Sequence, residues 1–513
     1  MDSTKKSLLN SLIKTGACSR QLASAEEPWR GRLILLKLML VVLVTAAGCS
    51  EAPQPQQEGQ GSGAVEESSE DSALTVDLLI EKGAVLTMDE EFTYHPVGYV
   101  AVKGDEIVEV GAGDVPAEIH GVRRIDASGH FVLPGLINGH QHAPMTVMRG
   151  VADDLALMDW LQNYIFPAEA ANVDEEMVYW GTLLAAMEMI RGGTTLYVDM
   201  YYYEDKVAEA TARAGMRGIL GETILDFPVP DAKDPKSGIE AAKVYLAKWK
   251  DHPLIIPAIA PHSPYTCSTE TLLACKAAAE EFDVPLVIHV AETQDELRQV
   301  KEKSGTTPVR YLRDIGFLDQ RVIAAHTVWV DAEEIALMKQ FGVGPVHNPE
   351  SNMKLASGVA PVPDMLDAGL AVGIGTDGPA SNNNLDLLDE LDSAAKLHKI
   401  HRMDPTVLSA RQALAMATRL GAQAVDMDHL VGSLEIGKKA DLILIKSDGL
   451  PQGVPSFDPY SSIVYSLGAE AVVMTVVNGS VVFENGSLTK IDEAEVYSKV
   501  AELSAKLRSS LEK

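Results

Sequence analysis

Short apolar runs alternate with longer helical segments through the middle of the chain, between residues 131 and 428. Segments such as DEEMVYWGTLLAAMEMIRGG and TETLLACKAAAEEF separate the apolar runs, and this alternation is typical of parallel strands joined by crossover helices. Eight candidate strands end near residues 142, 200, 223, 262, 292, 328, 348 and 377. They predict an α/β fold, a TIM (β/α)8 barrel, in which the chemistry lies at the C-terminal ends of the strands.

Both flanks of this middle region have a different pattern. Residues 74–130 and 429–490 contain short strand-like runs separated by Gly and Asp turns, as in GYVAVKGDEIVEVGAG and AVVMTVVNGSVVFENG. These flanks predict one small composite β-sandwich built from both ends of the chain. Residues 491–513 have a helical composition and predict a C-terminal helix.

The first 73 residues have the features of an export address and a tether. The apolar run from Leu33 to Gly48 is broken only by Lys37, and it is shorter than the roughly 20 residues that a membrane-spanning helix needs. Basic residues, this run and the small residues before Cys49 are typical of an export signal, and AAGC resembles the lipobox of bacterial lipoproteins. We therefore expect an export signal over residues 1–49.

The expected consequence is an extracytoplasmic protein that reaches the membrane only through a lipid anchor at Cys49. A start codon assigned too far upstream would leave a cytoplasmic protein instead. Residues 50–73 are polar and acidic without an apolar period, so they predict a disordered linker.

The charge and the cysteine content of the chain exclude some kinds of binding partner and site. The chain has 43 Lys and Arg against 73 Asp and Glu, a net charge of −30, so it is not expected to bind nucleic acid through the phosphates. Its 4 cysteines show no paired spacing, and the sequence predicts neither a disulfide framework nor a cysteine zinc site. A small molecule is the expected partner.

Metal-binding and proton-carrying residues end several of the predicted barrel strands. His140 and His142 close the first strand in INGHQH, and because alternate residues of a strand point the same way, both imidazoles can reach one metal ion. The residues that end strands five, six and eight are His289, Glu292, His326 and Asp377. Any one of them alone also fits a side chain that braces a loop. Together they predict an active site at the barrel mouth.

Six segments of the chain are similar to the amidohydrolase superfamily. They are LINGHQHAPMTVMRGVADDL, APHSPYTCS, IHVAET, AAHTVWV, HNPESNMKLASGVAPVPDML and GIGTDGPASNNNLDL. The resemblance runs in collinear order over about residues 75–490 and is nearest to the deaminase and chlorohydrolase branch, which contains methylthioadenosine/S-adenosylhomocysteine deaminases. It implies a hydrolase that acts on carbon–nitrogen bonds of cyclic amidines.

The resemblance implies one divalent metal ion, expected to be zinc, with a water at its open position. By similarity its ligands would be His140, His142, His289 and Asp377. Glu292 would protonate the ring nitrogen beside the attacked carbon, and His326 and Asp377 would carry protons from water toward departing ammonia. Binuclear relatives have a bridging lysine at the end of the fourth strand, where this chain has Pro261 and His262, so a single ion is expected.

Four further residues are candidates for substrate contact. By resemblance, Glu169 would accept hydrogen bonds from ribose hydroxyls and His262 would face the substrate. Trp160 and Trp329 could stack on a purine. Each has a structural alternative: a first-turn helix charge for Glu169, loop bracing for His262 and packing for both tryptophans. The residues after strands seven and eight that could bind substrate or cap loops include Asn348, Ser351, Asn352 and Ser381.

The predicted reaction is the hydrolytic deamination of an amino-substituted nitrogen heterocycle. Methylthioadenosine and adenosine fit better than S-adenosylhomocysteine, because the arginines that hold its carboxylate in relatives are replaced by a stretch with Glu222, Lys233 and Lys236. One alternative is an s-triazine chlorohydrolase or a related amidohydrolase with the same site. Another is a non-catalytic, lipid-tethered binding protein, but none of the metal-site positions is lost. The resemblance also implies a homo-oligomer.

Overall fold

The computed structural model describes residues 73–511. The predicted export signal, the lipid anchor at Cys49 and almost all of the predicted linker lie outside the described residues. Within residues 73–511, no helix combines the length and apolar character that crossing a membrane requires.

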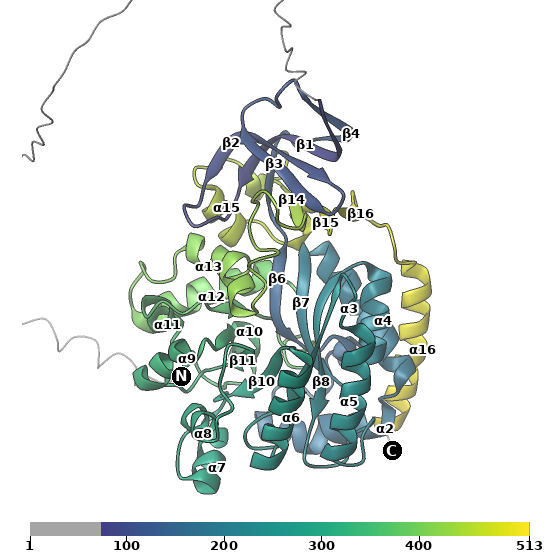
Figure 1. The fold of residues 1–513 in the computed structure, drawn as a ribbon, viewed down its shortest axis with the longest axis vertical. Coiled ribbons are helices and arrows are strands. Elements are labelled where there is room, and N and C mark those ends of the chain that lie inside the picture. Colours follow the sequence, from purple (N-terminus) through teal and green to yellow (C-terminus); the bar gives the residue numbers. More distant parts are fainter. Residues whose placement is uncertain (1–72, 512–513) are drawn as a thin grey trace, which may run out of the picture. The chain divides into compact units, whose positions relative to one another are not determined.

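Eight parallel strands form a nearly closed barrel, which confirms the predicted fold class (Figure 1). In chain order they are β6 (Leu136–Gln141), β7 (Thr194–Tyr201), β8 (Arg217–Ile224), β9 (Ile255–Pro261), β10 (Leu286–Val290), β11 (Val322–His326), β12 (Gly344–His347) and β13 (Gly373–Ile374). The first and last strands meet where the Asp377 amide donates to the His140 carbonyl at 3.0 Å. A Cβ on Gly375 would lie 2.7 Å from the His140 nitrogen, so glycine permits this closure.

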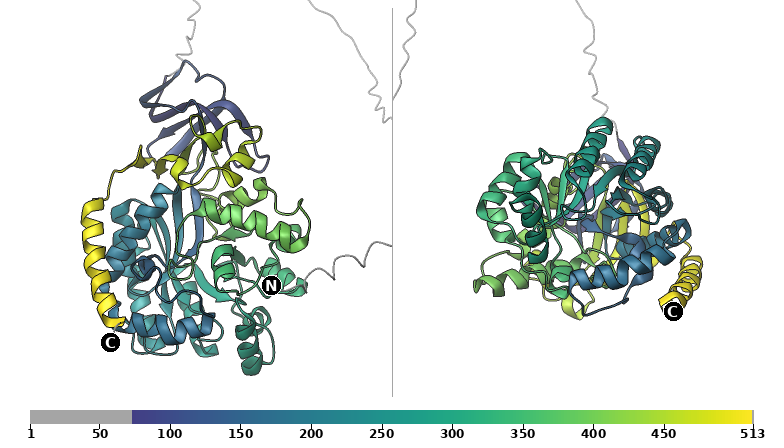
Figure 2. Two further views of the ribbon diagram at one scale, coloured as in Figure 1. Left: turned by 180° about the vertical axis from the view of Figure 1, so that it is seen from behind. Right: turned by 90° about the horizontal axis from the view of Figure 1, so that it is seen from below.

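Helices and short helical turns follow the barrel strands and surround them when the molecule is viewed from below (Figure 2). Before β10 they are η1 (Ala143–Met148), α1 (Leu157–Trp160), η2 (Leu161–Ile165), α2 (Phe166–Asn172), α3 (Glu175–Arg191), α4 (Glu204–Ala214), α5 (Pro235–Trp249) and α6 (Thr269–Phe282). After β10 they are α7 (Gln294–Ser304), α8 (Pro308–Asp314), α9 (Ala332–Phe341), α10 (Pro349–Lys354), α11 (Val362–Asp367), α12 (Leu387–Arg402), α13 (Ala410–Met416) and α14 (Arg419–Ala424).

Alternate residues of the barrel strands belong to two different cores. One cluster joins side chains from neighbouring strands, such as Val198, Ile219 and Val287, and these fill the barrel interior. The residues next to them in sequence, such as Leu220 and Ile288, belong to the large cluster that includes the helices. Because both faces of each strand are buried, the strands appear in the sequence as continuous apolar runs.

Strands from both ends of the chain form a second, mixed sheet of nine strands. This confirms that the two flanks build one composite β-structure. Its strands are β1 (Leu74–Leu86), β2 (Tyr94–Lys103), β3 (Glu106–Ala112), β4 (Ile119–Asp126), β5 (His130–Pro134), β14 (Leu442–Lys446), β15 (Val472–Val477), β16 (Ser480–Glu484) and β17 (Ser487–Leu488). The two ends join where β5 pairs antiparallel with β14, with Leu133 opposite Ile443. Ile80 and Val100 share one core with Leu442 and Val476.

The last part of the chain connects this sheet to the outer face of the barrel. Its elements are η3 (Pro451–Gly453), α15 (Pro459–Tyr465), η4 (Ala469–Ala471) and α16 (Glu493–Leu511). Helix α16 runs along the outside of the barrel beside α3 (Figures 1 and 2). It is attached there by ion pairs, of which Arg191 to Glu493 spans 2.7 Å.

A buried ion pair connects the barrel to the composite sheet. Arg217 at the start of β8 donates from Nε and Nη2 to Asp441 before β14, at 3.0 and 3.1 Å, and both side chains are buried. Arg217 also donates to Asn478 Oδ1 at 3.0 Å. Removing one partner from such a pair leaves an uncompensated buried charge.

We therefore expect Asp441→Ala to lower the free energy of unfolding by about 3–5 kcal/mol. Asp392→Ala, which removes a half-exposed ion pair with Lys396, is the control and should cost less than about 1 kcal/mol. Urea denaturation of the purified variants measures both. Equal effects in the two variants would show that the buried pair does not stabilise the junction.

Candidate active site

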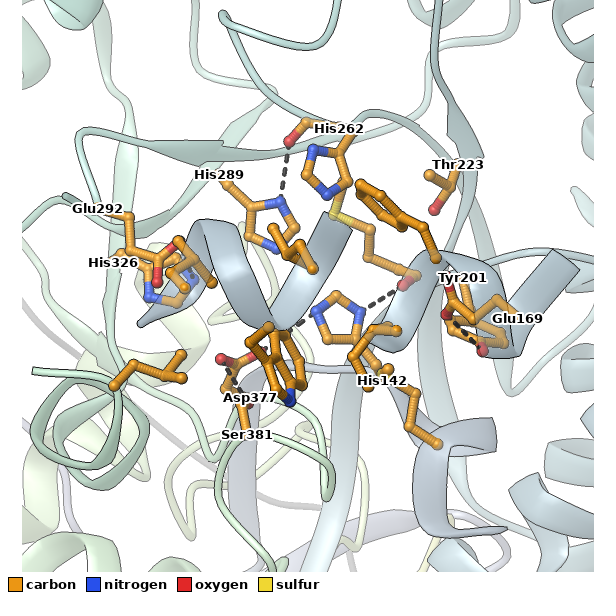
Figure 3. Close-up of a pocket in the computed structure, with 18 of the residues that line it drawn as sticks. His142, Glu169, Tyr201, Thr223, His262, His289, Glu292, His326, Asp377 and Ser381 are labelled. Atoms are coloured by element: carbon orange, nitrogen blue, oxygen red, sulfur yellow. Dashed lines mark hydrogen bonds and ion pairs between the residues drawn. The ribbon is translucent and has the colours of Figure 1, made fainter. Parts of the chain in front are cut away.

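The structure brings together all six strand-end residues that the sequence singled out. His140 lies in β6 and His142 follows it, and the others, at the ends of β10, β11 and β13, are His289, Glu292, His326 and Asp377. They gather at the C-terminal mouth of the barrel, and all except the fully buried His140 line one cavity (Figure 3).

Four histidines and an aspartate form a cluster with the spacing of a metal site. One ligand nitrogen each from His140, His142 and His289 lie within 4.8 Å of one another, and so do ligand atoms of His140, His326 and Asp377. Asp377 Oδ1 is 3.2 Å from His142 Nε2 and 3.5 Å from His140 Nε2. Imidazole nitrogens and a carboxylate oxygen are the donor set of catalytic zinc sites.

Backbone carbonyls fix the orientation of two of these imidazoles. His142 Nδ1 donates to the Met200 carbonyl at 2.5 Å, and His289 Nδ1 donates to the His262 carbonyl at 2.9 Å. Both therefore present the lone pair of Nε2 to the cluster, as the ligands of a metal do. Within residues 73–511, neither ring nitrogen of the fully buried His140 has a hydrogen-bond partner. A metal ion would give one of these two nitrogens a partner, so the residues present are suited to bind the ion.

The protonation states of His140, His289 and Asp377 also suit a cation. Burial lowers the pKa of His140 to about 4 and that of His289 well below its usual value, so both are neutral imidazoles. Burial opposes the ionisation of Asp377, but its contacts with His140 and His142 outweigh burial and hold the pKa of this carboxyl well below its usual value. Asp377 likewise raises the pKa of His142 to about 9 against the effect of burial, and a metal at Nε2 would compete with that proton.

Glu292 and His326 form the proton-carrying side of the cavity. Glu292 Oε2 lies 3.9 Å from His326 Nε2, and both side chains are buried. Burial raises the pKa of Glu292 above that of an exposed glutamate, so its carboxyl group holds a proton more readily. A carboxylic acid of this kind can act as a general acid.

The backbone is strained at the strand ends that carry these groups. His326 has φ of 75° and Asp377 has φ of 59°, and Ala291, directly before Glu292, has φ of 55°. Left-handed backbone is unfavourable for residues with a Cβ and concentrates at functional sites.

Three of the four predicted substrate-contact residues line the same cavity: Glu169, His262 and Trp160. Glu169 Oε1 accepts from the Tyr201 hydroxyl at 2.7 Å, and burial raises the pKa of Glu169 to about 7. His262 packs on His289 with ring centroids 4.7 Å apart. Figure 3 shows Glu169 and Glu292 on opposite sides of His142.

Trp329 does not line this cavity. Its indole Nε1 donates to the Ser357 carbonyl at 2.7 Å, and the ring borders a neighbouring hollow with Thr293 and Gln294. This placement matches the packing alternative, and stacking of Trp329 on a substrate stays a prediction.

Much of the remaining wall of the cavity is apolar. Its residues include Met145, Leu157, Leu161, Ile165, Phe166 and Leu355. No Lys or Arg of the described chain lines the cavity. A ligand group that lies against this wall is therefore desolvated without a compensating positive charge.

Comparison with known proteins identifies the family. The model of the amidohydrolase family matches residues 131–482. The chain belongs to the amidohydrolase family. It is 46% identical over 437 residues to the 5-methylthioadenosine/S-adenosylhomocysteine deaminase 1 of Syntrophus aciditrophicus, and the match covers 85% of this chain and 98% of that protein.

This amidohydrolase is also similar to a second relative and to a solved structure. The 5′-deoxyadenosine deaminase of Methanopyrus kandleri is 45% identical, over 74% of this chain and 87% of that protein. The structure of an adenosine deaminase from Xanthomonas campestris with bound zinc is 35% identical, with a TM-score of 0.82 over 85% of this chain and 99% of that one. The family resemblance is confirmed: the protein is a hydrolase that acts on carbon–nitrogen bonds, in a metal-dependent family.

The sequence reasoning missed the tyrosines of this amidohydrolase's cavity, among them Tyr201 and Tyr202. Tyr201 holds Glu169. Tyr201 ends β7, so the expectation that strand ends carry the chemistry would have found it. Both were passed over because an aromatic residue after an apolar run also fits the core.

Proposed function

We propose that this amidohydrolase removes the amino group from the base of an adenine nucleoside with a neutral 5′ group, such as 5′-methylthioadenosine, and releases ammonia. The observation that carries the proposal is one cavity with the metal-type cluster at its base, Glu292 and His326 on one side and Glu169 on the other. The names of the relatives support it.

In this proposal one ion, zinc, would be held by His140, His142, His289 and Asp377. When bound, it supplies the Lewis acidity that lowers the pKa of a water molecule toward neutrality. The other steps belong to the chain. His326 and Asp377 take one proton of the attacking water and pass it to the departing amino group. Glu292 donates its own proton to the ring nitrogen beside the attacked carbon.

The reaction balances as follows: water adds to the carbon, the carbon–nitrogen bond breaks, and ammonia leaves with one proton of the water. The second proton of the water returns from the added hydroxyl to Glu292 as the carbon–oxygen double bond of the oxo-purine nucleoside forms. Glu292 suits its step because burial raises its pKa and so favours the protonated form. Its Oε1 accepts from Ser357 Oγ at 3.2 Å, which leaves Oε2 toward the cavity and His326.

Glu169 is proposed to bind the two ribose hydroxyls. It is a buried carboxyl with one oxygen held by Tyr201, and a carboxylate accepts hydrogen bonds from a vicinal diol. Its position opposite Glu292 lets the base reach the proton donor while the sugar reaches Glu169.

The apolar wall favours a neutral 5′ group. The carboxylate of S-adenosylhomocysteine would lose its hydration there without meeting a lysine or arginine of the described chain. Glu222 does not line the cavity, and its carboxylate accepts from the Glu204 amide at 3.0 Å. We therefore place methylthioadenosine, 5′-deoxyadenosine and adenosine ahead of S-adenosylhomocysteine.

Glu169→Gln should lower kcat/KM for adenosine by about 10-fold or more, mostly through KM, because a hydrogen bond to a charged group contributes roughly 1.5–3 kcal/mol. The matched substrate is 2′,3′-dideoxyadenosine, which lacks the diol and should be turned over almost equally by both proteins. Steady-state kinetics with the two substrates measures this. An equal loss on both would show that Glu169 does not bind the diol.

Ammonia release by the purified, zinc-loaded protein tests the proposal. The substrates are methylthioadenosine, adenosine, S-adenosylhomocysteine, guanine, cytosine and an aminotriazine, with chloride release from a chlorotriazine in parallel. Release from a 5′-substituted adenosine supports the proposal. Chloride release alone would favour the chlorohydrolase alternative, and no product from any of them, with one zinc bound, would refute both.

The proposal includes export, with residues 1–49 as a lipoprotein signal and Cys49 as the lipid anchor of an extracytoplasmic enzyme. Cell fractionation and mass spectrometry of the mature N-terminus test it. A cytosolic protein that retains residues 18–47 would refute it. A homo-oligomer remains the expected assembly, and sedimentation of the purified protein measures it.

A further inference from the structure

One short segment, residues 348–357, contacts all three groups to which the proposed function gives a proton. The segment follows β12 and contains α10. Four of its polar side chains are buried: Asn348, Ser351, Asn352 and Ser357. Each has its hydrogen-bond contact with Asp377, His326 or Glu292. The four side chains contact other side chains of the protein, and none of the four lines the substrate cavity.

Asn352 contacts the nitrogen of His326 that points away from Glu292. Its Oδ1 lies 3.0 Å from His326 Nδ1, the shorter of two amide contacts, since Asn348 Nδ2 lies at 3.3 Å. An amide oxygen can only accept and an amide nitrogen can only donate, so the two contacts make opposite demands on Nδ1, and the shorter one, to Asn352, favours a proton on Nδ1. The lone pair of Nε2 then faces Glu292 and the cavity, where a proton must be accepted.

Ser351 and Ser357 each donate a hydrogen bond to one of the two carboxyl groups. Ser351 Oγ donates to Asp377 Oδ2 at 2.6 Å, beside Ser381 Oγ at 2.9 Å. Oδ1 accepts from the Gly378 amide at 2.8 Å and lies toward His140 and His142. Ser357 Oγ donates to Glu292 Oε1 at 3.2 Å. In each carboxyl group the segment contacts one oxygen, and the other oxygen lies toward a histidine of the site.

The segment is itself held in place. The Asn352 amide donates to the Asn348 carbonyl at 3.0 Å, and the Ser357 amide donates to the Asn352 carbonyl at 2.9 Å. Glu350 joins it to α12, because its amide donates to Glu390 Oε2 at 3.1 Å and its own Oε1 accepts from Ser393 Oγ at 2.7 Å. Such support is what keeps reacting groups within the narrow geometry that catalysis needs.

We infer that the four buried polar side chains of this segment position the three proton-carrying groups and that Asn352 is a positioning residue that fixes the tautomer of His326. The functional meaning of this inference rests on the proposed function, but the tautomer itself does not. A purely structural role for Asn352 predicts lost stability without any change in the protonation of His326.

The first test is NMR of the full-length protein with ¹⁵N-labelled histidine, with the His326 signals assigned by their absence in His326→Gln. The expected result is a proton on Nδ1 of His326 in the wild-type protein and a redistribution toward Nε2 in Asn352→Leu. Asn352→Asp keeps an acceptor oxygen and should retain the Nδ1 proton. A proton on Nε2 in the wild type, or identical His326 signals in wild type and Asn352→Leu, would overturn the inference.

The second test is kinetic and uses the zinc-loaded proteins with methylthioadenosine. Asn352→Leu should lower kcat by about 10- to 100-fold, the range seen when the partner of an active-site histidine is lost, with KM and zinc content unchanged. Asn352→Asp should recover most of kcat. Met353→Ala, at a half-exposed position of the same helix, is the control and should match the wild type.

Loss of kcat in Asn352→Leu that Asn352→Asp does not restore would overturn the role of the acceptor oxygen. An insoluble Asn352→Leu would be replaced by Asn352→Ala in both tests. If the wild-type protein itself releases no ammonia from any substrate, the proposed function fails, while the NMR result still decides the tautomer.

Discussion

Glu292→Gln should reduce the turnover of a nucleoside substrate by at least about 10²-fold, the scale of general acid catalysis, while the protein keeps its full zinc content. The amide has nearly the same shape as the carboxylic acid and cannot give up a proton in the required range. Since Glu292 does not belong to either of the groups of possible metal ligands, the cluster should remain intact. Steady-state kinetics and metal analysis of one preparation measure both quantities.

The control for this variant is Glu296→Gln. Glu296 is also buried, but its oxygens accept from the amides of Ala291 and Glu292 at 2.8 and 2.7 Å, so it supports the loop rather than facing the cavity. Its variant should lose stability more than turnover. Full activity of Glu292→Gln would mean that another group is the proton donor.

His289→Ala should lose zinc and activity together. The imidazole is fixed by the His262 carbonyl with Nε2 toward His140 and His142, and its removal leaves three of the four proposed ligands. We expect a loss of turnover of more than about 10³-fold, because without the ion the pKa of water stays near its bulk value. Metal analysis after gel filtration and ammonia release measure the two losses.

His401→Ala is the matched control, because His401 is an exposed histidine of α12. It should retain zinc and turnover. A His289→Ala protein that still binds one zinc per chain with unchanged affinity would remove His289 from the ligand set.

The barrel and the core of the site could be predicted because both depend on local pattern. Continuous apolar runs identified the buried strands, and the residue type at each strand end identified the chemistry. His140 and His142 share one strand, so their convergence follows from strand geometry alone. Asp377 and Glu292 needed only the expectation that parallel strands bring their C-terminal ends to one side of the barrel.

The contacts that were not predicted join residues far apart in sequence. Arg217 and Asp441 are 224 positions apart, and nothing local marks them as partners. The same holds for Asn352, whose sequence context allowed a contact to substrate or to a loop, whereas the structure directs it to His326. Trp329 lies close to a strand end, as the cavity residues do, but its ring nitrogen donates to the Ser357 carbonyl.

The most direct test of metal-dependent deamination is the rate of ammonia release from 5′-methylthioadenosine by one metal-depleted preparation, before and after one equivalent of zinc is added. The account predicts no release above background before the addition and sustained turnover after it, with the base converted to its oxo form. Equal rates before and after, or zinc bound at full occupancy without any ammonia, would contradict it.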